Sequence, residues 1–183
     1  MTNKTPEFLA KFPLGKVPAF ESGDGKFFLT EAQAIARYVA ESGPMADQLL
    51  GADARTRALI EQWSCFSDQE LAANIVPPLL MTVWKLYAFD EAAYAKHAVN
   101  FERAVNRVEA ALQGGRKFLV GEQLTLADIM VFGPLHLAGK FFMDAEMRKG
   151  VPSVEGYLKG LIEVPELKKA FGELELCEKR VQQ

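Results

Sequence analysis

Apolar residues recur every three to four positions from Arg55 onward, the spacing that places them on one face of an α-helix. The pattern predicts helices that begin near 55, cover 92–112, begin at 125, centre on 154–161 and begin again at 164–166. Pro77 and Pro78 must kink or end the first helix. The pattern leaves open whether this helix continues over the apolar run 79–88. We therefore expect residues 55–175 to form an all-helical bundle.

The beginning of the chain shows a different, mixed pattern. Thr5-Pro6-Glu7 has the residues preferred at a helix start, which predicts a short helix there. Residues 16–21 and 26–29 read as two short strands, and the segment Ser22-Gly-Asp-Gly25 between them has the composition of a tight turn. This part of the sequence therefore predicts a β-hairpin.

A further helix is expected directly after the hairpin. Thr30 and Gln33 have the T-x-x-Q spacing of a capping box, so we expect the helix to start at Thr30 and to end near Gly43. The following segment, 44–54, contains a proline and a glycine and is expected to be a linker. The predicted organisation is a first part at 1–43, a linker at 44–54 and a helical domain at 55–183.

Thr125 and Asp128 carry the clearest helix-start signal in the chain. The Thr125 side chain can accept a hydrogen bond from the N–H three residues on, and the Asp128 carboxylate can accept one from the N–H of Thr125. The flanking residues 118–120 and 129–135 are almost wholly apolar, which is typical of a helix in the middle of a domain. We interpret both residues as folding elements without a direct catalytic role.

Composition and charge exclude several classes of function. The chain has 183 residues, 49% of them hydrophobic and 25% charged, with a net charge of −3, so nothing indicates direct binding to nucleic acid or an anionic membrane. Cys65 and Cys177 lie far apart and no signal peptide is apparent, which predicts free thiols in a reducing compartment. The longest apolar run, near 131–138, is shorter than the roughly 20 residues that span a bilayer. We expect a soluble, cytoplasmic protein.

Few side chains suggest chemistry of their own. Cys65 has no basic residue three or four positions away to lower its pKa, which favours a buried, inert thiol. His97 and His136 lack a second ligand at metal spacing, so we predict no metal site and interpret His136 as a core histidine. Trp84 and Tyr87 are expected in the core, with an apolar substrate cleft as the alternative. No nucleotide-binding motif is present.

Two parts of the chain resemble the glutathione transferase family. The segment Phe118-Leu-Val-Gly-Glu-Gln-Leu-Thr-Leu-Ala-Asp-Ile129 resembles the N-capped sixth helix of that family's C-terminal domain. Residues 14–41 resemble the second half of its thioredoxin-like domain, and 55–175 its helical domain. The resemblance implies a mainly α fold, in which a glutathione-transferase C-terminal-like helical bundle is preceded by the second half, a β-hairpin plus a helix, of a thioredoxin-like α/β domain.

A more specific resemblance is to the gamma subunits of translation elongation factor 1B. It is carried by Asn3–Glu21 and supported by Leu29–Val39 and Leu49–Asp53. It implies a protein-interaction module that scaffolds the nucleotide-exchange complex in translation elongation, with other elongation factor 1B subunits as partners and a homodimer as a possibility. The alternative is an enzyme that conjugates glutathione or a related thiol to electrophiles, and both remain open at this point.

The resemblance also implies where a thiol would bind. In the transferase family the proline that matches Pro18 is cis, and the residue before it, here Val17, pairs with the cysteinyl part of the thiol. The family's Glu-Ser pair appears here as Glu31-Ala32, at a helix N-terminus that can hold the γ-glutamyl carboxylate. Ala32 lacks the hydroxyl that would add a hydrogen bond. The alternative is that Val17, Pro18, Glu31 and Ala32 only shape the fold; glutathione or a related thiol is a possible ligand, and no cofactor is required.

The start of the chain departs from the family pattern. Members of the transferase family begin with a strand–helix–strand unit that carries the catalytic Tyr, Ser or Cys, and the present sequence starts after that unit. Either the natural protein extends beyond Met1, or it is a variant without the activating residue, and the sequence leaves both open. We assign no catalytic residue within the 183 residues.

Overall fold

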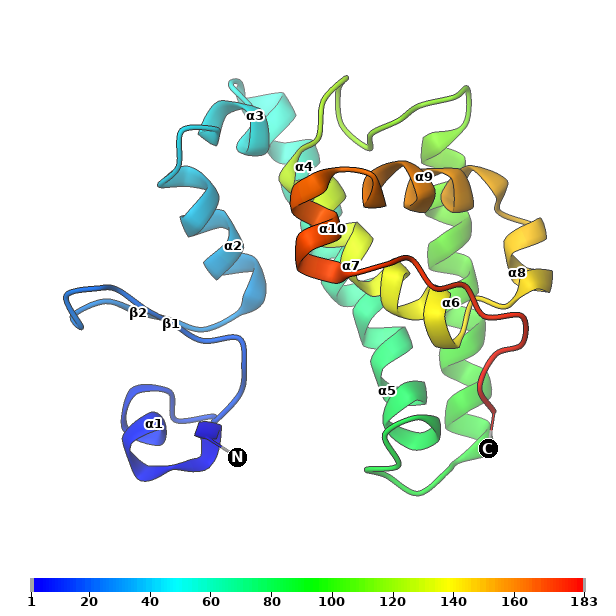
Figure 1. The fold of residues 1–183 in the computed structure, drawn as a ribbon, viewed down its shortest axis with the longest axis horizontal. Coiled ribbons are helices and arrows are strands. Elements are labelled where there is room, and N and C mark those ends of the chain that lie inside the picture. The colour runs from blue at the N-terminus through cyan, green and yellow to red at the C-terminus, as the bar shows by residue number, and fades with distance from the viewer. Residues whose placement is uncertain (1, 183) are drawn as a thin grey trace.

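The larger part of the molecule is a bundle of helices, as the periodicity predicts. The computed structural model describes residues 2–182, and α4 to α10 gather around α7 and the long helix α6 (Figure 1). The helices of the bundle are α4 (Ala54–Phe66), α5 (Ala73–Thr82), α6 (Glu91–Leu112), α7 (Leu126–Phe141), α8 (Ala145–Lys149), α9 (Pro152–Ile162) and α10 (Pro165–Phe171). Within the described residues no helix is both long and apolar enough to cross a bilayer.

The start of α7 is the polar centre of this bundle. Asp128 is fully buried, and its carboxylate accepts hydrogen bonds from the N–H of Leu119 at 2.8 Å, the N–H of Thr125 at 2.9 Å and the hydroxyl of Tyr157 at 2.9 Å. The Thr125 hydroxyl also donates to this carboxylate, at 3.0 Å. The predicted helix start at Thr125 is therefore confirmed, and it also fixes the preceding loop and α9 to α7.

The prolines Pro77 and Pro78 do not end their helix. Helix α5 runs through both of them to Thr82, and the irregularity lies upstream in a wide π-helical turn, η2 (Ser67–Ala72), which joins α4 to α5. Fully buried apolar side chains such as Ile75 and Leu79 hold α5 in the core although two N–H donors are missing. The expected continuation over 79–88 thus stops at Thr82.

The residues after α5 correct a second prediction. Trp84 is 44% exposed and Tyr87 is 64% exposed, so neither packs in the core as expected. The helix has ended by this point, and the segment between α5 and α6 contains turns instead of a face directed at the bundle. These aromatic side chains lie on the surface.

The N-terminal part contains the predicted short helix and hairpin. Its elements are η1 (Thr2–Lys4), α1 (Pro6–Lys11), β1 (Phe20–Glu21) and β2 (Phe28–Leu29). The Thr5 hydroxyl caps α1 by accepting from the N–H of Phe8 at 3.3 Å. The two strands are antiparallel, with Phe20 opposite Leu29 and Glu21 opposite Phe28. They are shorter than the expected strands at 16–21 and 26–29, and Pro18 has no N–H to donate to a ladder.

Helix α2 (Ala32–Glu41) begins later than predicted. Its N-cap is Glu31, whose side chain makes no capping hydrogen bond, so the predicted capping box from Thr30 to Gln33 is wrong. The physical reason is that the backbone of Glu31 adopts φ 68°, which turns the chain sharply between β2 and α2 and leaves Thr30 outside the helix. Gln33 instead donates to Glu61 in α4 at 3.0 Å.

The segment predicted as a linker contains a helix of its own. Helix α3 (Ala46–Leu50) lies within 44–54, and its residue Leu50 is buried. Helices α2 and α3 pack against each other and against α7, and Gln48 of α3 donates to the carbonyl of Leu124 at 3.0 Å. These contacts attach the N-terminal part to the bundle (Figure 1). Domain boundaries at residues 43 and 55 stay a prediction.

The C-terminal segment 172–182 lies along α7 without helical structure (Figure 1). The N–H of Cys177 donates to the carbonyl of Gly139 at 2.8 Å, and the N–H of Val181 donates to the carbonyl of Phe141 at 2.8 Å. Arg180 forms a two-fold ion pair with Asp144, at 2.7 and 3.3 Å. The segment is thus tied down, and Cys177 is half-buried, with its thiol pKa raised by burial.

Candidate functional site

A cavity of about 240 Å³ lies between the hairpin region, the start of α2 and the turn η2. Its wall includes all four residues that the sequence suggested for a thiol site, Val17, Pro18, Glu31 and Ala32. Lys16, Thr30 and Asp68 add further polar groups, and the apolar side chains of Phe12 and Leu14 also contribute. The fold therefore brings the predicted site residues together around one space.

The Val17–Pro18 bond is cis, as the resemblance implied. Val17 is 67% exposed, and within residues 2–182 neither its N–H nor its carbonyl makes a backbone hydrogen bond. Backbone groups without an internal partner are available to an extended ligand that adds as a short strand. Val17 thus presents a peptide-binding edge to the cavity.

The start of α2 supplies the second binding element. Because the Glu31 side chain does not cap the helix, the first N–H groups of α2 have no side-chain acceptor at the N-cap. These N–H groups form the positive end of the helix dipole. Glu31 itself has φ 68° and ψ 115°, a conformation that is costly for a residue with a side chain. Such strain is concentrated at functional sites, and here it lies on the cavity wall.

Asp68 is the site residue that sequence reasoning missed. It belongs to η2, on the bundle side of the cavity, more than 30 positions from the other lining residues. A helix with one widened turn cannot be distinguished by periodicity from a regular one, so no local signal placed Asp68 there. Together Lys16, Glu31 and Asp68 give the cavity one cationic and two anionic groups, a set that suits a ligand carrying both carboxylate and ammonium groups.

Cys65 is only half-buried, whereas the sequence predicted a buried thiol. It faces the interface between α4 and α2, where Gln33 Nε2 donates to its Sγ at 3.3 Å and its own thiol points at Glu61 Oε1, 3.8 Å away. Its neighbours are thus an amide and a carboxylate, and no basic side chain is among these hydrogen-bond partners.

The two histidines make structural contacts. His97 Nδ1 lies 3.1 Å from Asn74 Oδ1, and burial, with a smaller effect of Lys96, lowers its pKa. His136 was expected to be a satisfied core histidine; it is half-buried, and its Nε2 lies 3.2 Å from the carbonyl of Glu173. Among residues 2–182 no group of three or more His, Cys, Asp or Glu side chains is arranged to hold a metal ion.

Two family models and several known proteins match this chain. Residues 1–41 match the glutathione S-transferase N-terminal domain, and 91–160 match the glutathione S-transferase C-terminal domain. The chain is 45% identical to the glutathione S-transferase-like protein LUC7 of a Fusarium species, over 93% of this chain and 76% of that protein. The chain therefore belongs to the glutathione S-transferase family.

Two further comparisons concern elongation factor 1-gamma. The Xenopus laevis elongation factor 1-gamma-A is 38% identical over 100% of this chain, which spans 40% of that longer protein. The crystal structure of the glutathione-transferase-like domain of elongation factor 1-gamma from Saccharomyces cerevisiae superposes with a TM-score of 0.84 at 24% identity, covering 96% of this chain and 81% of that one. This structural likeness confirms the predicted fold.

Proposed function

We propose that the chain binds glutathione, or a closely related thiol peptide, in the cavity at Val17 and Glu31. The observation that carries the proposal is the convergence of Val17, Pro18, Glu31 and Ala32 on one space of about 240 Å³. Their sequence separation alone does not require them to meet. The match to relatives named glutathione S-transferase-like supports the same ligand class.

Each end of the peptide has a partner of suitable chemistry. The N–H and carbonyl of Val17 pair with the cysteinyl residue as a short antiparallel strand. The free N–H groups at the start of α2 donate hydrogen bonds to the γ-glutamyl carboxylate, which the helix dipole also favours. Asp68 is the acceptor for the γ-glutamyl ammonium group, and Lys16 is the cation for the glycyl carboxylate.

The reaction that fits this site is conjugation of the bound thiol to an electrophile. The thiol gives up its proton to solvent or to a base, and its sulfur forms a bond to the electrophilic carbon to give a thioether. In a substitution the leaving group departs with the electron pair of its bond to that carbon, and in an addition to an activated double bond the neighbouring carbon takes up a proton from solvent. The described residues position the peptide, and we assign none of them as the base. The proposed role of this chain is thus thiol binding and presentation.

The test is isothermal titration of the complete 183-residue chain with glutathione. We expect saturable binding that Glu31→Ala weakens at least tenfold, because the substitution removes one of the two carboxylates on the cavity wall that attract the γ-glutamyl ammonium group. Glu41→Ala, at the far end of the same helix, is the matched control and should bind as the original chain does. Absence of saturable binding by a folded chain would refute the proposal.

A second candidate is the scaffold role in the elongation factor 1B complex. It is supported by the 38% identity to elongation factor 1-gamma-A over the whole chain. Exposed large apolar side chains after α5, namely Trp84, Leu86 and Tyr87, give a surface suited to a protein partner. In this role the chain holds other elongation factor 1B subunits together, in the cytoplasm and as a monomer or homodimer.

The scaffold role is tested by co-purification with recombinant elongation factor 1B subunits. We expect a stable complex that Trp84→Ser combined with Tyr87→Ser weakens. The matched control is Val99→Ser, which changes an exposed apolar residue at a different place, on α6. A complex that survives the double substitution would exclude this surface, and failure to form any complex would exclude the role.

A further inference from the structure

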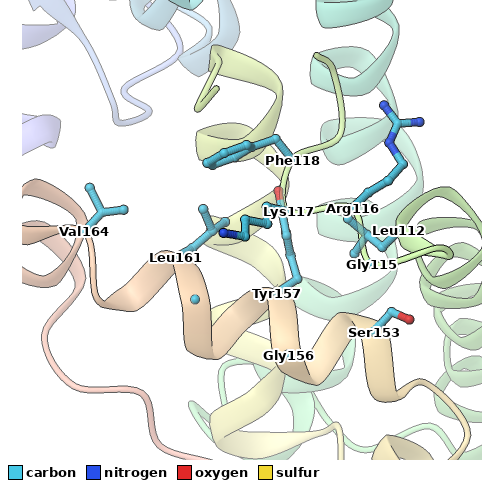
Figure 2. A pocket seen from close by; sticks show the side chains of 11 residues that line it. Leu112, Gly115, Arg116, Lys117, Phe118, Ser153, Gly156, Tyr157, Leu161 and Val164 are labelled. Atoms are coloured by element: carbon cyan, nitrogen blue, oxygen red, sulfur yellow. The ribbon is translucent and has the colours of Figure 1, made fainter. Parts of the chain in front are cut away.

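A larger cavity, of about 500 Å³, lies between the α6–α7 connection and α9 (Figure 2). Its volume lies within the range of about 300–1,000 Å³ that small-molecule sites occupy. It shares no lining residue with the cavity at Val17 and Glu31. A ligand here would therefore be independent of the proposed thiol site.

The walls of this cavity are mainly apolar. Leu112, Phe118 and Leu161 contribute their side chains, and Tyr157 contributes its ring. The Tyr157 hydroxyl already donates to Asp128 at 2.9 Å, so the ring offers the cavity carbon surface only. Figure 2 shows Phe118 on the connecting segment above the α9 helix that carries Tyr157 and Leu161.

Two glycines keep the α9 side of the cavity open. Gly156 and Gly160 are one helical turn apart on α9, and both line the cavity. A Cβ atom added to either residue would meet no heavy atom within 4 Å, so close packing of the protein does not require glycine at these positions. Glycine weakens a helix interior relative to alanine, yet α9 carries two on this face. What they provide is space next to Phe118 and Tyr157.

Lys117 gives the cavity a positive charge. Its side chain extends toward α9 in Figure 2, beside Leu161, whereas the Arg116 guanidinium is directed away from α9. In the described chain Lys117 takes part in no ion pair. The nearby carboxylate of Glu109 is occupied, because it accepts from the N–H groups of Ser153 and Val154 at 3.2 and 2.9 Å.

We propose that this cavity is a binding site for a compact apolar anion, of the class of aromatic carboxylates. The ring lies between Phe118 and the glycine face of α9, and the carboxylate pairs with Lys117. The apolar walls supply the affinity through buried surface, and the ammonium group of Lys117 selects an anion over a neutral molecule of the same shape.

The experiment uses 1-naphthoate as the probe and follows the amide signals of Gly115, Gly156 and Gly160 by NMR during titration of the complete chain. We expect saturable shifts at these three glycines. Gly160→Leu should abolish them, because the leucine side chain occupies the cavity. Leucine is a better helix former than glycine, and a Cβ at this position meets no heavy atom within 4 Å, so the variant should melt no lower than the original chain.

The charge requirement is tested by Lys117→Gln. We expect it to weaken 1-naphthoate about fivefold and to leave the neutral analogue 1-naphthalenemethanol unchanged. Lys96→Gln, on the distant first half of α6, is the matched control and should change neither affinity. The proposal is overturned if Gly160→Leu binds 1-naphthoate with unchanged affinity, or if the shifts appear around Val17 and Glu31 instead.

Discussion

The hydroxyl of Tyr157 in α9 donates a 2.9 Å hydrogen bond to Oδ1 of Asp128 in α7, and the same oxygen accepts from the N–H of Leu119. Both side chains are buried, Asp128 completely. Burial raises the pKa of Asp128, and burial together with the neighbouring carboxylate raises the pKa of Tyr157 well above its usual value. One carboxylate thus joins the start of α7, the loop before it and α9.

Removal of this carboxylate should destabilise the bundle strongly. Asp128→Ala leaves the buried N–H groups of Leu119 and Thr125 and the hydroxyl of Tyr157 without an acceptor, and we expect a loss of about 3 kcal/mol or more in unfolding free energy. Tyr157→Phe removes one donor and should cost about 1–2 kcal/mol. Urea unfolding measures both. Tyr87→Phe, at an exposed position, is the control with little effect, and equal losses in the two tyrosine variants would contradict the argument.

Glu31 should be a position where glycine stabilises the chain. At φ 68° and ψ 115° a side chain is costly, and glycine removes this cost at the expense of a more flexible unfolded chain. We expect Glu31→Gly to raise the unfolding free energy by about 1 kcal/mol in urea titrations. Glu31→Ala keeps a Cβ and should bring no such gain. A gain of equal size from alanine would show that the carboxylate, and not the backbone, is unfavourable.

The proposed thiol site offers a gain-of-function test at Ala32. Ala32→Ser adds a hydroxyl at the first residue of α2, on the cavity wall, where it can donate to the γ-glutamyl carboxylate. One such hydrogen bond should tighten glutathione binding about three- to tenfold in isothermal titration. Ala36→Ser, one turn further along α2, is the matched control. Unchanged glutathione affinity in both variants would show that the γ-glutamyl carboxylate does not bind next to Ala32.

The Asp144–Arg180 pair predicts part of the acid dependence of stability. The hydrogen bond from Arg180 is the main reason that the pKa of Asp144 is lowered. Because the folded pKa lies below the unfolded value of about 3.9, the pair contributes fully above that pH, and its contribution is lost as the pH falls further. We expect Asp144→Asn to cost about 1 kcal/mol near pH 7, and the difference from the original chain to shrink below about pH 4.

Urea unfolding of the two chains at several pH values checks this prediction. Asn retains an oxygen that can cap α8 through the N–H of Met147, so the change isolates the ion pair with Arg180. A difference that stays constant between about pH 7 and pH 2.5 would contradict it.

Most of the fold could be predicted from the sequence because its signals are local. The 3.6-residue periodicity identified most helices of the bundle but not the short α8, and Thr5 and Thr125 marked the starts of α1 and α7. The start of α2 was misplaced because the unusual backbone of Glu31 has no signature in residue types. Trp84 and Tyr87 were expected in the core because an apolar run does not reveal where a helix ends.

The candidate site was predictable only through family resemblance. Val17, Pro18, Glu31 and Ala32 carry no unusual chemistry, and their meeting in one cavity is a result of the tertiary fold. Asp68 could not be added from the sequence, since its position depends on the turn η2. The cavity at Lys117 was missed for a similar reason: Gly156 and Gly160 read as weak points of a helix, and only the structure shows the space above them.

The π-helical turn Ser67–Ala72 lets the chain hold one extra residue without changing the direction of the helix that follows. Such a turn accommodates one more residue than a regular α-helical turn. Each residue of a regular α-helix turns the chain by about 100°, so an extra residue in an unwidened helix would rotate α5 by that amount and carry Ile75 and Leu79 out of the core. The widened turn absorbs this rotation. Deletion of one residue within Ser67–Ala72 should therefore leave the core face of α5 in place and change the turn itself, which carries Asp68 at the wall of the cavity.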